Sequence, residues 1–224
     1  MYGLVHTNPI GAMAEWLCCG LQIRLGRFDS GLRLQNLQVL PPSHSIWSID
    51  APASSDPQQK YWLHRAGALT AGLRKLGHVD LRVVAEHPDM LTPAEAWMLQ
   101  RPEASPIWVR EIVMAIDSTD CVFARSFTPL PASLGLWQGM RKLQTRPLAD
   151  MLYNDPDITR SRFYTCRLTP SEPIYRSALQ AFGTTCPAAS DLLARCSVFW
   201  RSDEPLLVAE CFLPDFWNIA KINI

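Results

Sequence analysis

The sequence lacks an excess of charge of either sign. Among its 224 residues, Lys and Arg together number 21, and Asp and Glu together also number 21. A broad basic surface is what attracts proteins to nucleic acid irrespective of base sequence. We therefore expect neither DNA nor RNA as a partner. The charged fraction of 19% is ordinary for a folded protein.

The chain also lacks the spacings on which metal sites and disulfide frameworks are built. Its seven cysteines are an odd number and include no Cys-x-x-Cys pair. Its five histidines have neither His-x-His nor His-Glu-x-x-His spacing. Zinc sites and disulfide-rich folds depend on such patterns. We expect no metal, and reduced thiols in the cytoplasm.

Membrane-spanning runs and common nucleotide motifs are missing as well. The apolar stretch at residues 10–23 is short, contains Glu15 and follows no basic segment, so we expect neither a membrane span nor a signal peptide. No Gly-x-Gly-x-x-Gly, Walker loop or Gly-x-Ser-x-Gly elbow occurs. The usual sequence support for nucleotide binding and serine hydrolysis is therefore absent.

Patterned sequence begins only after an irregular start. Residues 1–57 lack sustained periodicity and end in turn-rich segments that contain Pro41-Pro42 and Ala51-Pro52. We predict an N-terminal extension at residues 1–57, loosely ordered, followed by one domain at residues 58–224.

Within this domain, helical and strand patterns predict an α+β fold. Asp56-Pro57 begins one predicted amphipathic helix that ends before Gly77, and Thr92 to Glu95 form a capping box. Strands are predicted at residues 79–83, 107–116, 121–128, 162–168, 194–201 and 206–213, hairpin turns at 117–120 and 202–205, and short helices at 134–143 and 147–153. Hairpins without βαβ units predict an antiparallel sheet flanked by helices.

Three predicted strands carry a charged residue on an otherwise apolar face. Side chains alternate between the faces of a strand, so Arg110 shares its face with Trp108 and Ile112. Arg125 and Glu210 have similarly apolar same-face neighbours. A buried charge is costly unless it is paired. The pattern predicts either an enclosed polar pocket for an anion or a mutual Arg–Glu salt bridge.

Five segments resemble, in order and spacing, the chorismate pyruvate-lyase family. They are Trp108–Ile112, Ala124–Pro129, Arg146–Ala149, Ile158–Arg160 and Ala209–Pro214. The resemblance covers residues 58 to 218 and implies a small antiparallel sheet with a closed internal site under helical flaps. It also implies the activity: cleavage of chorismate into 4-hydroxybenzoate and pyruvate, the first step of ubiquinone ring synthesis.

The same resemblance implies roles for five residues. Arg110 would hold the ring carboxylate, and Glu210 would face the 4-hydroxyl. Glu210 removes the C4 proton or only orients the hydroxyl, or the hydrogen passes directly to the enolpyruvyl group; the apolar face of its strand favours orientation with partial base character. Backbone amides near Leu69 and Leu148 would complete the grip on the ring carboxylate. Arg125 would lie near the enolpyruvyl carboxylate. Chorismate carries two carboxylates on a largely apolar ring. Guanidinium groups suit the carboxylates, and apolar walls suit the ring.

The resemblance also sets the expected partners of the chain. Aromatisation drives the cleavage downhill, so no cofactor is expected. Chorismate and 4-hydroxybenzoate are the expected small-molecule partners, bound by a monomer.

Two other functions stay open at this stage. The effector-binding domains of GntR-type transcription regulators share the fold and would bind a small molecule without catalysis. Against this, residues 1–57 contain no recognisable helix-turn-helix, and the chain lacks a basic face. A scaffold domain whose buried charges pair only with each other would neither bind nor react.

Overall fold

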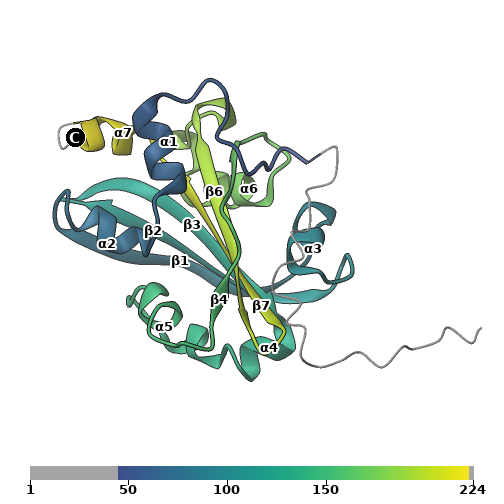
Figure 1. Ribbon diagram of the computed structural model, residues 1–224. Coiled ribbons are helices and arrows are strands. Elements are labelled where there is room, and N and C mark those ends of the chain that lie inside the picture. The colour runs from purple at the N-terminus through teal and green to yellow at the C-terminus, as the bar shows by residue number, and fades with distance from the viewer. Residues whose placement is uncertain (1–44, 222–224) are drawn as a thin grey trace, which may run out of the picture. The chain divides into compact units, whose positions relative to one another are not determined.

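A seven-stranded antiparallel sheet forms the centre of the chain in the computed structural model, which describes residues 45–221 (Figure 1). The strand order is β1-β2-β3-β7-β6-β4, and β5 also pairs with β6. The strands are β1 (Val79–Met90), β2 (Pro106–Ile116), β3 (Thr119–Pro129), β4 (Thr159–Arg160), β5 (Tyr164–Arg167), β6 (Leu193–Arg201) and β7 (Glu204–Phe212). The predicted α+β class with an antiparallel sheet is confirmed.

Both predicted hairpins form, and their turns have the conformation that tight hairpins require. Asp117 and Ser118 join β2 to β3 with φ of 46° and 70°, and Ser202 and Asp203 join β6 to β7 with φ of 45° and 64°. Two consecutive residues at positive φ match the right-handed twist of the paired strands. The turns fix the register of the two hairpins, which decides the face that each side chain takes.

Helices cover both faces of the sheet, but they do so in different ways. One face packs against α3 (Pro93–Leu99) and α6 (Pro173–Phe182). At one end of the other face lie α1 (Pro57–His64), α2 (Leu69–Leu73) and α7 (Pro214–Lys221). At its other end lie α4 (Leu130–Leu134), the 3-10 helix η1 (Gln138–Lys142) and α5 (Ala149–Leu152). Figure 1 shows these two helix groups at opposite ends of the sheet.

The predicted single helix between Asp56 and Gly77 is wrong, because the chain breaks it into α1 and α2. Asp56 does cap the first helix, and it exchanges hydrogen bonds with Gln59 in a capping box. The helix ends at His64, since Arg65 has a ψ of 121° and so leaves the helical conformation, and Gly67 has a φ of 77°. Leu69, Leu73 and Leu76, whose helical spacing suggested that this helix continues to Gly77, belong to α2 and the turn after it.

Of the other predicted helices, α3 is confirmed, whereas the two predicted at residues 134–143 and 147–153 differ in type or length. The capping box of Thr92 and Glu95 begins α3 as expected. The helix predicted at residues 134–143 is instead α4 followed by η1, and the one predicted at 147–153 is reduced to α5. The short 3-10 helices η2 (Gly183–Thr185) and η3 (Ala189–Asp191) follow α6.

Residues 45–57, which fall in the predicted extension, pack on the sheet. Ser48 forms a β-bridge with Thr165, and the Trp47 side chain is buried against the face covered by α3 and α6. Its indole Nε1 donates a hydrogen bond of 3.0 Å to Glu172. Residues 1–44 and 222–224 lie outside the described residues, and the domain boundary at residue 57 stays a prediction.

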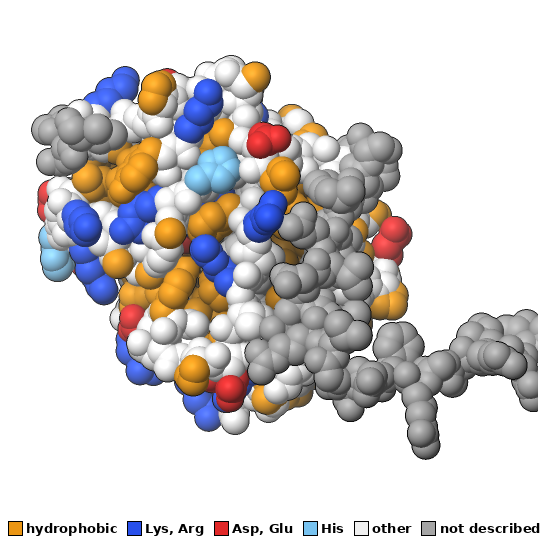
Figure 2. Space-filling model, viewed as in Figure 1, with side chains coloured by type: hydrophobic (Ala, Val, Ile, Leu, Met, Phe, Trp, Pro, Cys, Tyr) orange, Lys and Arg blue, Asp and Glu red, His pale blue; other side chains and the backbone are white. Residues whose placement is uncertain are grey.

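The described surface mixes side chains of different kinds. Figure 2 shows Lys and Arg side chains dispersed among hydrophobic ones on the face in view. Large exposed apolar residues such as Tyr61, Met90 and Leu134 come from separate elements, which is ordinary for a protein surface. Among residues 45–221, no helix has the length and apolar character needed to cross a membrane.

The described cysteines are all free thiols. Cys121, Cys166, Cys196 and Cys211 are buried and Cys186 is half-buried, while Cys18 and Cys19 lie outside the described residues. Burial raises the pKa of the Cys121 thiol to about 11 and that of Cys196 well above its ordinary value. A protonated, buried thiol is a weak nucleophile and behaves as a small apolar side chain.

Candidate functional site

A cavity of about 50 Å³ lies on the face of the sheet between the two helix groups. Strands β1, β2, β3, β6 and β7 form its floor, and residues from both helix groups form its walls. Its apolar lining includes Leu69, Leu81, Ile112, Met114, Ala124, Leu148, Leu152, Phe163, Phe199 and Val208. Its polar lining includes Thr70, Ser126, Tyr153, Arg195, Ser197 and Glu210. Such a cavity suits a small ring-shaped molecule that carries a few polar groups.

Strand register places Arg110 and Glu210 on this same face. Arg110 pairs across β2 and β3 with Ser126, and Ser126 pairs in turn with Val208 of β7. Glu210 follows Val208 by two residues and so returns to the same face. Two strand spacings and two residues separate the two Cα atoms by roughly 12 Å. The two charged side chains can therefore contact opposite ends of one ring-shaped molecule.

Arg110 is not among the residues that line the cavity, but its neighbours Ile112 and Ser126 are, and its side chain is held by groups on both sides. Its side chain is 1% exposed, and its Nε donates a hydrogen bond of 3.1 Å to Glu86 of β1. Its Nη2 donates to the carbonyl oxygens of Gln144 and Arg146, in the segment that leads into α5. Burial lowers the pKa of Arg110, and the neighbouring Glu86 opposes this shift. Arg110 thus connects the sheet to the segment that carries Leu148.

Glu210 lines the cavity and lies beside a cation. Its Oε2 accepts a hydrogen bond of 2.6 Å from Nε of Arg195, its cross-strand neighbour on β6. The Arg195 Nη1 donates to the carbonyls of Trp62 and Arg65 at the end of α1, at 2.9 and 3.1 Å. Glu210 is therefore not isolated among apolar side chains, as its own strand suggested. The carboxylate is oriented by a guanidinium that is itself held by α1.

Leu69 and Leu148 face the cavity from opposite helix groups. Leu69 is the first residue of α2 and is 4% exposed, while Leu148 directly precedes α5 and is 7% exposed. Both line the cavity together with Glu210. The structure thus brings Leu69, Leu148 and Glu210 to one cavity and Arg110 to the same face of the sheet.

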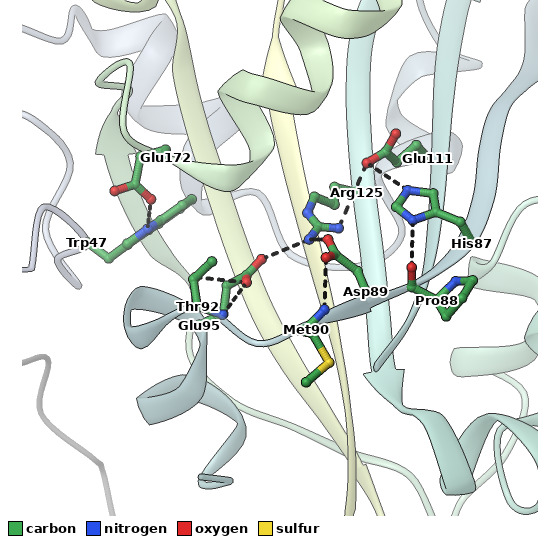
Figure 3. Close-up of polar contacts among 10 residues, drawn as sticks. All are labelled: Trp47, His87, Pro88, Asp89, Met90, Thr92, Glu95, Glu111, Arg125 and Glu172. Carbon is green, nitrogen blue, oxygen red and sulfur yellow. Dashed lines mark hydrogen bonds and ion pairs between the residues drawn. The ribbon is translucent and has the colours of Figure 1, made fainter. Parts of the chain in front are cut away.

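Arg125 lies on the opposite face of the sheet, so the expectation that it sits near the enolpyruvyl carboxylate is corrected. Its cross-strand neighbours are Glu111 and Ala209, which point away from the cavity. Figure 3 shows Arg125 among carboxylates of its own chain. Its Nη2 lies 3.0 Å from Asp89 and 3.3 Å from Glu95, and its Nη1 lies 3.8 Å from Glu111. Arg125 stabilises a buried charge cluster behind the sheet.

A smaller cavity of about 20 Å³ accompanies this cluster and is lined by Trp47, Glu95, Arg125 and Glu172. Burial raises the pKa of Glu172, nearby Glu95 adds to the shift, and the hydrogen bond from Trp47 opposes it. The folded state therefore holds the Glu172 proton more tightly than the unfolded chain does. Stability contributed by the neutral carboxyl is lost as pH rises from the unfolded to the folded pKa.

We accordingly expect the Glu172→Gln variant to unfold at a higher temperature than the parent at pH 7. At pH 3, below the ordinary pKa of a glutamate side chain, both states protonate Glu172 and we expect no gain, because glutamine still accepts the Trp47 hydrogen bond. Thermal unfolding at the two pH values measures this difference. An equal gain at both would show that the charge of Glu172 is not the cause.

Two contributors to the site were missed by sequence reasoning. Arg195 satisfies the same test as Arg110, since its same-face neighbours on β6 include Leu193 and Phe199, and that pattern could have identified it. Glu86 could not be found in this way. A register shift between Val83 and Ala85 reverses the alternation along β1 and brings Glu86 opposite Arg110.

The described residues offer no group of three or more His, Cys, Asp or Glu side chains arranged to hold a metal ion. The titratable groups that line the cavity are Tyr153, Arg195 and Glu210, and the Arg110–Glu86 pair lies beside it on the same sheet. These groups can hold an anion at two places and accept a hydrogen bond at a third.

Comparison with known proteins identifies relatives over most of the chain. A family model described as "Chorismate lyase" matches residues 41–222. A protein of Bordetella pertussis named "Probable chorismate pyruvate-lyase" is 55% identical over 178 residues, which cover 80% of this chain and 93% of the relative. A protein of Pseudomonas entomophila named "Probable chorismate pyruvate-lyase 1" is 38% identical over 178 residues, which cover 79% and 94%.

Solved structures with a related arrangement are more distant in sequence. A GntR-family transcriptional regulator from Bacillus cereus matches with a TM-score of 0.43 and 13% identity, over 61% of this chain and 92% of that chain. The effector domain of PhnF from Mycobacterium smegmatis matches with a TM-score of 0.41 and 14% identity, over 66% and 90%.

Proposed function

The chain belongs to the chorismate lyase family, and from this we propose that it cleaves chorismate into 4-hydroxybenzoate and pyruvate as the first step of ubiquinone ring synthesis. The observation that carries the proposal is a largely apolar cavity lined by Glu210, on the face of the sheet to which strand register also brings Arg110. In this proposal residues 58–224 are the catalytic domain and residues 1–57 an extension. The enzyme acts in the cytoplasm, as a monomer and without a cofactor.

The reaction requires little chemistry from the protein beyond position and charge. The C3–O bond of chorismate breaks and its electron pair leaves with the enolpyruvyl oxygen. The C4 proton is lost, the C4–H electrons complete the aromatic ring, and a proton reaches the enolpyruvyl methylene carbon to give pyruvate. Because aromatisation supplies the driving force, correct placement and stabilisation of developing charge account for most of the acceleration.

Each part of the cavity has a task in this scheme. Arg110 binds the ring carboxylate, with the backbone amides near Leu69 and Leu148 completing that grip. Ile112, Met114 and other apolar side chains of the floor and walls contact the ring and exclude water. Low local polarity strengthens the charged contacts at both ends. Glu210 accepts the hydrogen bond of the 4-hydroxyl and so fixes the C4 proton in one direction.

A coupled assay tests the proposed function directly. Purified protein is mixed with chorismate, pyruvate is followed with lactate dehydrogenase, and 4-hydroxybenzoate is followed by its absorbance. We expect equal amounts of both products. A sensor of the GntR type would bind 4-hydroxybenzoate and release no pyruvate, and a scaffold would do neither.

We expect Glu210→Gln to lower kcat by about 10- to 100-fold, because the amide can still orient the hydroxyl but cannot take a proton. Glu204→Gln is the matched control, since Glu204 lies on the same strand and pairs with Arg101 outside the cavity. Steady-state kinetics on both variants measures the difference. Near-normal turnover by Glu210→Gln would remove the base role and leave orientation alone.

A further inference from the structure

One end of the cavity carries more positive than negative charge. Arg195 is 1% exposed. Its side chain donates three hydrogen bonds, from Nε to Glu210 and from Nη1 to two backbone carbonyls. Its Nη2 donates to no residue within 45–221. A buried guanidinium retains its charge, and its unused N–H groups favour an acceptor. Since Arg195 lines the cavity, that acceptor can come from a bound molecule.

A second arginine contacts the same part of the site. The guanidinium carbon of Arg160 lies 4.1 Å from the centroid of the Phe163 ring, and that of Arg195 lies 4.4 Å from it. Phe163 lines the cavity. The Nη1 of Arg160 is buried and has no hydrogen-bond partner among the described residues. Two cations therefore share one aromatic ring, while Glu210 is the carboxylate paired with Arg195.

The hydroxyl of Tyr153 interacts with the same charged groups. It lines the cavity, and burial raises the pKa of its hydroxyl while Arg160 and Arg195 lower it and Glu210 raises it. At this end, then, the phenol of Tyr153, the guanidinium of Arg195 and the carboxylate of Glu210 line the cavity, and the guanidinium of Arg160 lies over the lining residue Phe163. With Arg160 and Arg195 positive and Glu210 negative, the net charge of these groups is one positive charge, which one further carboxylate would neutralise.

We propose that Arg195, with Arg160 beside it, forms the subsite for the enolpyruvyl carboxylate of chorismate. This inference rests on the proposed function. The ring carboxylate of chorismate stands opposite C4, and the enolpyruvyl ether is on C3, the carbon next to C4. A substrate with its ring carboxylate at Arg110 and its hydroxyl at Glu210 therefore places its second carboxylate beside the residue that is hydrogen-bonded to Glu210.

The subsite also acts on the bond that breaks. When the C3–O bond opens, its electron pair moves onto the enolpyruvyl oxygen, close to the carboxylate that Arg195 binds. Negative charge grows at this end until the proton from C4 reaches the methylene carbon. A fixed guanidinium stabilises that charge without reorganisation. Arg195 thus serves both binding and cleavage, so its loss affects KM and kcat.

Two ligands separate this role from a structural one. The probe 3-(1-carboxyvinyloxy)benzoate carries both carboxylates, and its ring is already aromatic, so aromatisation cannot drive its cleavage. 4-Hydroxybenzoate lacks the second carboxylate. We expect Arg195→Gln to weaken binding of the first ligand by about 10- to 100-fold and that of the second by less than about 3-fold. Arg195→Lys should restore part of the loss. Quenching of tryptophan fluorescence on the full chain measures both dissociation constants.

A second variant keeps the test decisive if Arg195→Gln does not fold. Arg160 is half-buried, and Arg160→Gln is expected to weaken the two-carboxylate probe by about 3- to 10-fold with no change for 4-hydroxybenzoate. The matched control is Arg201→Gln, which removes an arginine of β6 that pairs with Asp155. Equal effects on both ligands in every folded variant would overturn the subsite. If wild-type protein released no pyruvate from chorismate, the proposed function itself would fail instead.

Discussion

Replacing Arg110 with methionine is expected to lower kcat/KM for chorismate by about 30- to 1,000-fold. The side chain lies on the face of the sheet that carries the cavity and Glu210, so its loss removes the proposed partner of the ring carboxylate. Methionine keeps much of the apolar stem and leaves the packing of β2 intact. The coupled pyruvate assay measures the fall in kcat/KM, and the dissociation constant of 4-hydroxybenzoate should rise as well.

The main alternative for Arg110 is a purely structural pair with Glu86, and a second substitution separates the two. Arg110→Met leaves Glu86 without its partner, although the Glu86 side chain is 29% exposed and regains water. Adding Glu86→Gln removes the unpaired charge and should restore stability without restoring activity. Recovery of both together would show that Arg110 holds the fold and not the substrate.

Replacing Arg125 with methionine is expected to lower the free energy of unfolding by about 3–5 kcal/mol. For a domain of this size such a loss lowers Tm by roughly 6 to 20 °C. The reason is that Glu95 and Glu111, with side chains 9% and 5% exposed, lose their common cation and remain buried. Activity per folded molecule at low temperature should stay within about twofold, because Arg125 lies behind the sheet.

An exposed arginine on the same sheet provides the control for Arg125. Arg82 pairs with Asp120, and their side chains are 56% and 39% exposed. Arg82→Met should therefore cost less than about 1 kcal/mol. Thermal and denaturant unfolding compare the two variants. If Arg125→Met kept its stability and lost its turnover, the catalytic role that the resemblance implied for Arg125 would stand.

The sheet could be predicted from sequence because its signals are local. The turn residues at 117–120 and 202–205 and the alternation along β2, β3, β6 and β7 identify the two hairpins without knowledge of distant contacts. The helices were less predictable. Leucines at helical spacing across residues 69–76 fit one helix, but non-helical Arg65 and positive-φ Gly67 break the chain between α1 and α2.

The site was predictable in part, for a reason that lies in strand register. Alternation tells which residues of one strand share a face, and it marked Arg110, Arg125 and Glu210 equally. Alternation does not tell which residues of two neighbouring strands lie on the same face of the sheet, because that depends on the register between the strands. Pairing of Arg110 with Ser126, and not with Arg125, is what sends Arg125 to the other side of the sheet. That phase depends on turn geometry and bulges that single-strand patterns do not contain.

The crystal structure of the protein with 4-hydroxybenzoate is the most direct test of the central claim that Arg110 and Glu210 grip opposite ends of one ring. We expect the product in the cavity between α2 and α5, its carboxylate within hydrogen-bond distance of Arg110 and its hydroxyl at Glu210. A product bound behind the sheet near Arg125, or held with its carboxylate at Glu210, would contradict it.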